Sequence, residues 1–88
     1  MPLLDTVLDT RELLQREGLW TRAVEVLRQA AATVADHGAR VRCLARAAAL
    51  QEDRLGQVEP AIAGWTEVLA LQPDEPDALA RLQNLYLR

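Results

Sequence analysis

The chain has 88 residues, a formal net charge of −3, and a composition that is 50% hydrophobic and 26% charged. A chain of this length forms one domain with a modest core. Its balance of apolar and charged residues excludes an intrinsically disordered protein. The acidic balance also argues against nucleic-acid binding, which uses a basic surface to neutralise phosphates. We therefore expect no nucleic-acid partner.

Cysteine usage and hydropathy indicate the cellular compartment of the protein. Cys43 is the only cysteine, so it has no partner within the chain for a disulfide, which is typical of a reducing compartment. No apolar run approaches the roughly 20 residues of a membrane span, and residues 1–5 lack the features of a signal peptide. We predict a cytoplasmic protein with no membrane contact. All ten basic residues are arginine, which is typical of a GC-rich bacterial genome.

Glycine and proline divide the chain into five segments of helical length. The breaks fall at Gly18, Gly38 and Gly56 and between Pro73 and Pro76. Ala, Leu, Arg and Glu dominate the sequence, and all four are strong helix formers. No segment alternates apolar and polar residues as a half-buried strand does. We therefore predict an all-α protein of about five helices, in which short turns make neighbouring helices antiparallel.

The first two predicted helices cover residues 3–17 and 19–36. The first has a loose apolar stripe. The apolar residues of the second recur at steps of one and three, which keeps them on one buried face of a helix. They are Trp20, Ala23, Val24, Leu27, Ala30, Ala31 and Val34.

The other three predicted helices cover residues 39–55, residues 58–71 and the C-terminal segment. The last of them begins near Asp74 or Glu75, because either side chain is a suitable N-terminal cap and Pro76 follows, where a helix accepts proline. Apolar residues again recur at helical spacing in all three segments. Trp20 and Trp65 both lie on apolar stripes, so we predict that they belong to the core.

The second and fourth predicted helices share an internal pattern. In each, a glycine precedes an alanine by five residues, and a large apolar residue follows the alanine by four. The matching residues are Gly18, Ala23 and Leu27 in one helix, and Gly56, Ala61 and Trp65 in the other. Ala61 follows Ala23 by 38 residues. This separation indicates helical repeats, whose periods run from about 20 to 50 residues.

With Pro73, this pattern resembles the tetratricopeptide repeat family of bacterial type. Gly56, Ala61, Trp65 and Pro73 have the spacing of the family's turn glycine, second-helix alanine, aromatic residue and closing proline. The resemblance covers nearly the whole chain and implies a right-handed array of helical hairpins with two and a half repeats in one domain. The domain covers residues 1–88, with units at about 4–37 and 42–75 and a terminal helix at 76–88.

The resemblance implies a non-catalytic scaffold that binds a protein or peptide segment. The binding groove would be formed by the first, third and fifth helices. In this register the groove is lined by Arg46, Leu50, Asp53, Arg54, Asp77, Arg81 and Asn84. The first helix would add Leu8, Glu12 and Gln15. Some family members clamp the C-terminal carboxylate of a chaperone, but Leu8 and Glu12 occupy two positions of that clamp, so we do not expect this ligand.

The ends of the chain favour an alternative function, which is self-assembly into a homo-oligomer. Repeat arrays normally finish with a polar capping helix, whereas both terminal segments here are apolar. Exposed apolar patches mark sites for partners. The candidate self-association residues are Leu3, Leu4, Leu85, Tyr86 and Leu87.

Little in the sequence indicates catalysis. The chain has no serine, and the pair His37 and Cys43 has no evident third group to orient the histidine. One histidine and one cysteine are too few for a typical zinc site of four ligands, and there is no glycine-rich phosphate loop. We expect no catalytic, metal-binding or cofactor-binding residues, and no enzymatic activity.

Overall fold

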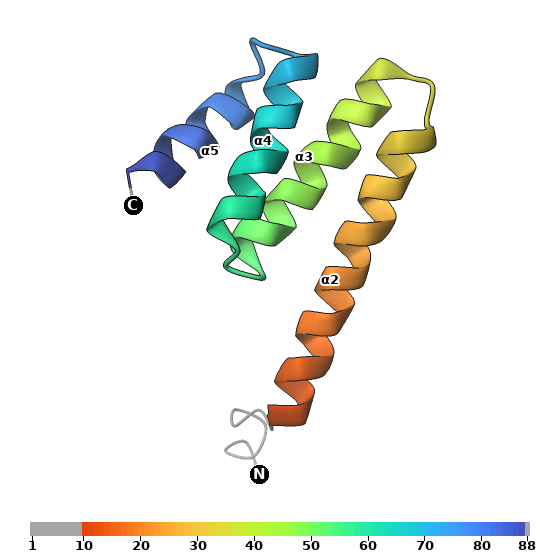
Figure 1. Cartoon of the computed structure of the whole chain (residues 1–88), viewed down its shortest axis with the longest axis vertical. Coiled ribbons are helices and arrows are strands. Elements are labelled where there is room, and N and C mark those ends of the chain that lie inside the picture. The colour runs from red at the N-terminus through yellow and green to blue at the C-terminus, as the bar shows by residue number, and fades with distance from the viewer. Residues whose placement is uncertain (1–9, 88) are drawn as a thin grey trace.

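The structure is a computed structural model that describes residues 10–87, with side chains from Arg16 onward. These residues form four α-helices and no strand, which confirms the all-α prediction (Figure 1). The helices are α2 (Thr10–Thr33), α3 (His37–Asp53), α4 (Val58–Leu71) and α5 (Pro76–Tyr86). No helix among them is long and apolar enough to cross a membrane.

Each helix packs mainly against the next one along the chain, α2 on α3, α3 on α4 and α4 on α5. Figure 1 shows the resulting array, with α2 at one edge and α5 at the other. The N-terminal part of α2 extends beyond the ends of α3 and α4. Short turns of a few residues explain this order, because they return the chain directly against the helix that it has just left.

Local signals set most of the helix ends. Asp36 caps α3, since its side chain accepts a hydrogen bond from the backbone N–H of Ala39 at 2.8 Å, so α3 begins two residues earlier than predicted. The bounds of α4 are those predicted from the sequence. Glu75 caps α5 and accepts a hydrogen bond from the backbone N–H of Asp77 at 3.3 Å, with Pro76 in the first turn. This cap confirms one of the two predicted starts of α5.

The predicted break at Gly18 is wrong. Helix α2 continues through this glycine without interruption, so the described residues form four helices and no hairpin turn at Gly18. A glycine inside a helix costs only about 1 kcal/mol relative to alanine, and Leu19 and Trp20, which follow, are not capping residues. The part of the first predicted helix before Thr10 lies outside the described residues.

The core lies between α3, α4 and α5 and extends to one face of α2. Its central side chain is Trp65, which is 2% exposed, as predicted. The same prediction for Trp20 is wrong, because this side chain is half-buried and lies outside the core cluster. Small residues let α3 and α4 approach closely, because a Cβ added at Gly64 would lie 2.9 Å from the Cβ of Ala48. The other core residues are Ala31, Val41, Leu44, Ala61, Val68, Ala78 and Leu85.

Leu85 corrects the predicted self-association surface. Its side chain is only 3% exposed and packs in the core, so it is not available to a partner. Tyr86 and Leu87 are 70% and 79% exposed, as the prediction requires. Leu3 and Leu4 lie outside the described residues. The reason for the difference is the helical period, which turns Leu85 toward α4 while its two successors point away.

Candidate functional site

A groove of about 550 Å³ opens along α3 and reaches α5. Its wall on α3 is made by small residues, including Ala45 and Ala49, and Leu27 of α2 and Trp65 of α4 contribute apolar surface. Of the predicted partner-binding residues, three line this groove. They are Arg46, Asp77 and Arg81.

Arg81 is held by carboxylates of α3. Its Nη1 donates to Glu52 Oε1 at 3.1 Å and to the carboxylate oxygens of Asp53 at 3.0 and 3.2 Å. The guanidinium carbon also lies 5.6 Å from the ring centroid of Trp65, and Trp65 Nε1 donates to Glu52 Oε1 at 3.3 Å. We call these four residues the Arg81 cluster. It joins α3, α4 and α5 at one end of the groove.

The electrostatics of the cluster favour a charged Arg81. Burial alone lowers the pKa of this guanidinium, but the hydrogen bonds and negative charges of Asp53 and Glu52 outweigh burial and raise the pKa above its ordinary value. The Glu52 side chain is only 5% exposed, so its carboxylate is paired inside the protein, with Arg81 and Trp65 among its partners.

This pairing changes the roles of two predicted binding residues. Asp53 and Arg81 are paired with each other, so neither is a free charge for a partner. The cations that remain on the groove are Arg42 and Arg46, which are both exposed and make no ion pair with a described residue. Arg42 was not among the predicted site residues. Its spacing of four from Arg46 on one helix is the sequence signal that identifies it.

The other predicted groove residues lie apart from this groove. Arg54 covers the ring of Trp20, with 5.2 Å from the guanidinium carbon to the ring centroid. Both residues line a separate pocket of about 430 Å³ near the N-terminal part of α2. Leu50 is half-buried and Asn84 is exposed, and neither lines any of the three pockets described for this protein. Leu8, Glu12 and Gln15 fall outside the described side chains.

The structure does not bring His37 and Cys43 together as a catalytic pair. Both lie on α3, where six residues correspond to a rise of about 9 Å and a rotation of about 240° around the helix axis. His37 is exposed at the start of the helix, whereas Cys43 is half-buried on the groove wall. The described residues contain no group of three or more His, Cys, Asp or Glu side chains placed to hold a metal ion.

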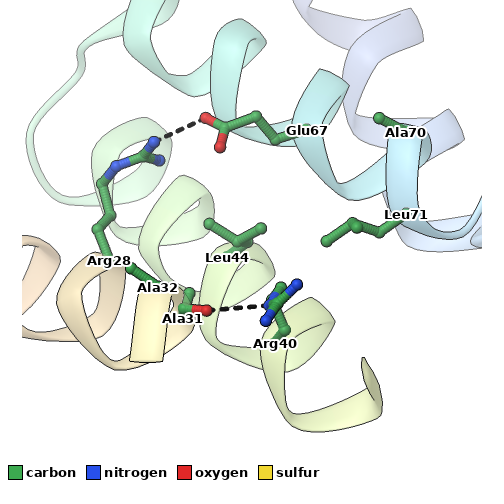
Figure 2. A pocket seen from close by; sticks show the side chains of 8 residues that line it. All are labelled: Arg28, Ala31, Ala32, Arg40, Leu44, Glu67, Ala70 and Leu71. Carbon is green, nitrogen blue, oxygen red and sulfur yellow. Dashed lines mark hydrogen bonds and ion pairs between the residues drawn. The ribbon is translucent and has the colours of Figure 1, made fainter. Parts of the chain in front are cut away.

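A third cavity, of about 480 Å³, lies on the other side of α3, and Figure 2 shows it from close by. It is formed where the last turns of α2, the first turns of α3 and the last turns of α4 meet. Arg42 and Arg46 follow Arg40 and Leu44 by two residues, and two residues correspond to about 200° of helix rotation. Helix α3 therefore presents one basic pair to the groove and a different set of residues to this pocket.

Comparison with models of protein families, with curated proteins and with solved structures finds no match to this chain. The likeness to tetratricopeptide repeats therefore depends on the residues that carry it. Of these, Gly56 lies in the turn between α3 and α4, and Ala61 and Trp65 lie on the buried face of α4.

Proposed function

We propose that this protein is a non-catalytic scaffold of the tetratricopeptide type that binds a protein or peptide segment in the groove between α3 and α5. The observation that carries the proposal is the pair Arg42 and Arg46. Both side chains are exposed beside an apolar groove and make no ion pair with a described residue. Exposed charges next to an apolar cleft are suited to orient a ligand whose apolar part fills the cleft.

The chemistry of the groove defines the segment that it accepts. Leu27, Ala45 and Ala49 are half-buried and supply apolar surface, so a small or branched apolar side chain is suited to contact them. An acidic side chain of the same segment would then lie within reach of the two arginines. The Arg81 cluster fixes α5 on α3, so the groove is formed before the ligand arrives, and a preformed groove lowers the cost of ordering on binding.

The test is to select ligands and then remove the two charges. Peptides would be selected from a random 12-residue display library on the intact chain, and their affinities measured for the native chain and for Arg42→Glu/Arg46→Glu. We expect acidic, apolar peptides whose affinity falls at least tenfold in the variant. The matched control is Arg22→Glu, an exposed arginine of α2 that lines none of the three pockets. Equal affinity for all three proteins would contradict the proposal.

The second candidate function is self-assembly through the outer face of α5. It is favoured by the exposure of Leu79, Tyr86 and Leu87, which are 50%, 70% and 79% exposed. Light scattering over a concentration series would test it. A mass of 9.8 kDa at every concentration argues against self-assembly. A larger species that Leu87→Glu returns to the monomer supports it. Leu85→Glu is unsuitable here, because that side chain is in the core.

A further inference from the structure

The pocket in Figure 2 has an apolar floor and a polar rim. Leu44 and Ala31 are 7% and 3% exposed and form the floor with the half-buried Leu71. The side chains of Arg28, Arg40 and Glu67 surround this floor. The volume of about 480 Å³ falls within the range of about 300–1,000 Å³ that is usual for small-ligand sites.

Arg40 is fixed in one orientation at the edge of the pocket. Its Nε donates to the carbonyl oxygen of Ala31 at 3.1 Å, and its Nη2 donates to the carbonyl oxygen of Val34 at 2.9 Å. These carbonyls are at the C-terminal end of α2, where helices leave acceptors unpaired. A guanidinium has five N–H groups, and Nη1 of Arg40 makes no hydrogen bond with a described residue. Arg40 therefore keeps donors for a ligand and loses little freedom on binding.

Arg28 and Glu67 form an ion pair on the opposite side of the pocket. Their Nη2 and Oε1 atoms are 2.7 Å apart, and their side chains are 40% and 44% exposed. An ion pair with this exposure contributes little to stability. A ligand carboxylate can therefore replace Glu67 as the partner of Arg28 at a small cost in free energy. With two arginines and one glutamate, the pocket has a formal charge of +1.

We propose that this pocket binds a carboxylate that carries a compact branched apolar group. The carboxylate accepts hydrogen bonds from the free donors of Arg40, since guanidinium groups pair with carboxylates in a directed, often bidentate way, and Arg28 adds a second positive charge across the pocket. The apolar group covers Leu44 and Leu71. This chemistry occurs in free branched carboxylic acids and at the C-terminal leucine or valine of a polypeptide. The site is separate from the groove on the other face of α3.

The first experiment is an NMR titration of the ¹⁵N-labelled full chain with N-acetyl-leucine and with N-acetyl-leucine amide. The two probes differ only in the carboxylate. We expect saturable shifts at the backbone amides of Arg40, Leu44 and Leu71 with the acid, and at least tenfold weaker binding of the amide. Equal binding of the two probes, shifts confined to other residues, or no saturable shift with either probe would each overturn the proposal.

Variants of the exposed ion pair make opposite predictions. Glu67→Gln releases Arg28 and should tighten binding of N-acetyl-leucine severalfold, whereas Arg28→Gln should weaken it severalfold. Both side chains are substantially exposed, so the fold is retained, as a thermal melt would verify. Glu59→Gln, an exposed acid of α4 outside the pocket, is the matched control and should have no effect. Changes in the same direction for Glu67→Gln and Arg28→Gln would overturn the proposal.

Two further measurements separate shape from charge and one ligand source from the other. Ala70→Phe places a ring beside Leu71 at the pocket without altering charge, because Ala70 lines the pocket and is exposed, and it should reduce binding at least tenfold. Unchanged affinity in this variant would overturn the proposal.

A tetrapeptide Ala-Ala-Ala-Leu with a free C-terminus would be compared with N-acetyl-leucine. Tighter binding of the peptide supports a polypeptide terminus as ligand, and equal or tighter binding of the acid supports a free acid.

Discussion

Gly18 and Gly56 begin the same sequence pattern, yet they have opposite structural roles. Gly18 lies inside α2, where an added Cβ would meet no atom within 4 Å. Gly56 lies between α3 and α4 with a φ of 62°, a left-handed conformation that side chains with a Cβ rarely adopt. Around it, the N–H of Leu55 donates to the carbonyl of Leu50 at 3.1 Å, and that of Gln57 to Gln51 at 2.8 Å.

The comparison shows that the glycine alone does not produce the turn. The chain reverses at Gly56 because the helix that follows buries Ala61 and Trp65 against α3. After Gly18 the exposed residues Leu19 and Val26, at 69% and 56%, lie on a helix that packs on α3 over only part of its length (Figure 1). Tertiary packing stabilises a reversal in one region and gives no advantage to it in the other.

The largest expected difference between the two regions is at their tryptophans. Trp65→Ala should lower the free energy of unfolding by about 3–5 kcal/mol, because a fully buried ring is removed from the core. Trp20→Ala should cost about 1 kcal/mol, since Trp20 is only half-buried and its main polar contact is Arg54. Urea unfolding followed by circular dichroism measures both. Equal losses would mean that α2 is as tightly integrated as α4.

The next effect tests how closely α3 and α4 pack. Gly64→Ala adds a methyl group 2.9 Å from the Cβ of Ala48, so the helices must separate, and we expect a loss of about 1–3 kcal/mol. The thermal unfolding midpoint relative to the native protein measures this loss. A midpoint that stays the same or rises would show that the two helices have room to spare.

Two arginines on tryptophan rings provide a third comparison. Arg81→Gln should lower the free energy of unfolding by about 2 kcal/mol, because it removes the charged hydrogen bonds that Arg81 makes to the buried carboxylate of Glu52 and to Asp53. Arg54→Gln removes only a cation–π contact at an exposed arginine and should cost about 0.5–1 kcal/mol. Chemical denaturation of both variants is the measurement, and a larger loss for Arg54→Gln would contradict the assignment of the Arg81 cluster as a stabilising connection between α3 and α5.

The pH dependence of this contribution follows from the raised pKa of Arg81. A cation with a raised folded-state pKa contributes stability fully below its unfolded-state pKa and loses it only as pH rises through the folded-state pKa. For an arginine that loss lies at strongly alkaline pH. Loss of the arginine proton therefore has no effect between pH 6 and pH 9. The unfolding difference between the native chain and Arg81→Gln should stay constant over this interval.

The last two expected effects have opposite signs at the two glycines. Gly56→Ala should cost about 1–2 kcal/mol, because alanine is strained at a φ of 62°. Gly18→Ala should instead stabilise the protein by about 0.5–1 kcal/mol. Alanine loses less backbone entropy than glycine when the helix forms, and an added Cβ at this position meets open space. Parallel thermal melts of the two variants check the signs. A destabilising Gly18→Ala would contradict a continuous α2.

Features that depend on local sequence could be read correctly before the structure was known. The bounds of α4, the cap at Glu75 and the core position of Trp65 all follow from capping chemistry or helical periodicity. Such signals act over one or two turns of helix, so neighbouring residues are sufficient to define them. The distinction between α-helix and strand is local in the same sense.

Tertiary structure decided the features that join distant residues. The pairing of Arg81 with Asp53 links residues 28 positions apart. No local spacing in the sequence indicates that these two predicted partner-binding residues pair with each other. The continuity of α2 through Gly18 was not evident from its sequence pattern either, because the same pattern contains a turn at Gly56. The helical period separates Leu85 from Leu87 around α5, but only packing on the neighbouring helices decides which of the two is buried. The physical reason is that charge compensation and burial are set by contacts between helices, whereas helix formation and capping are set within one helix.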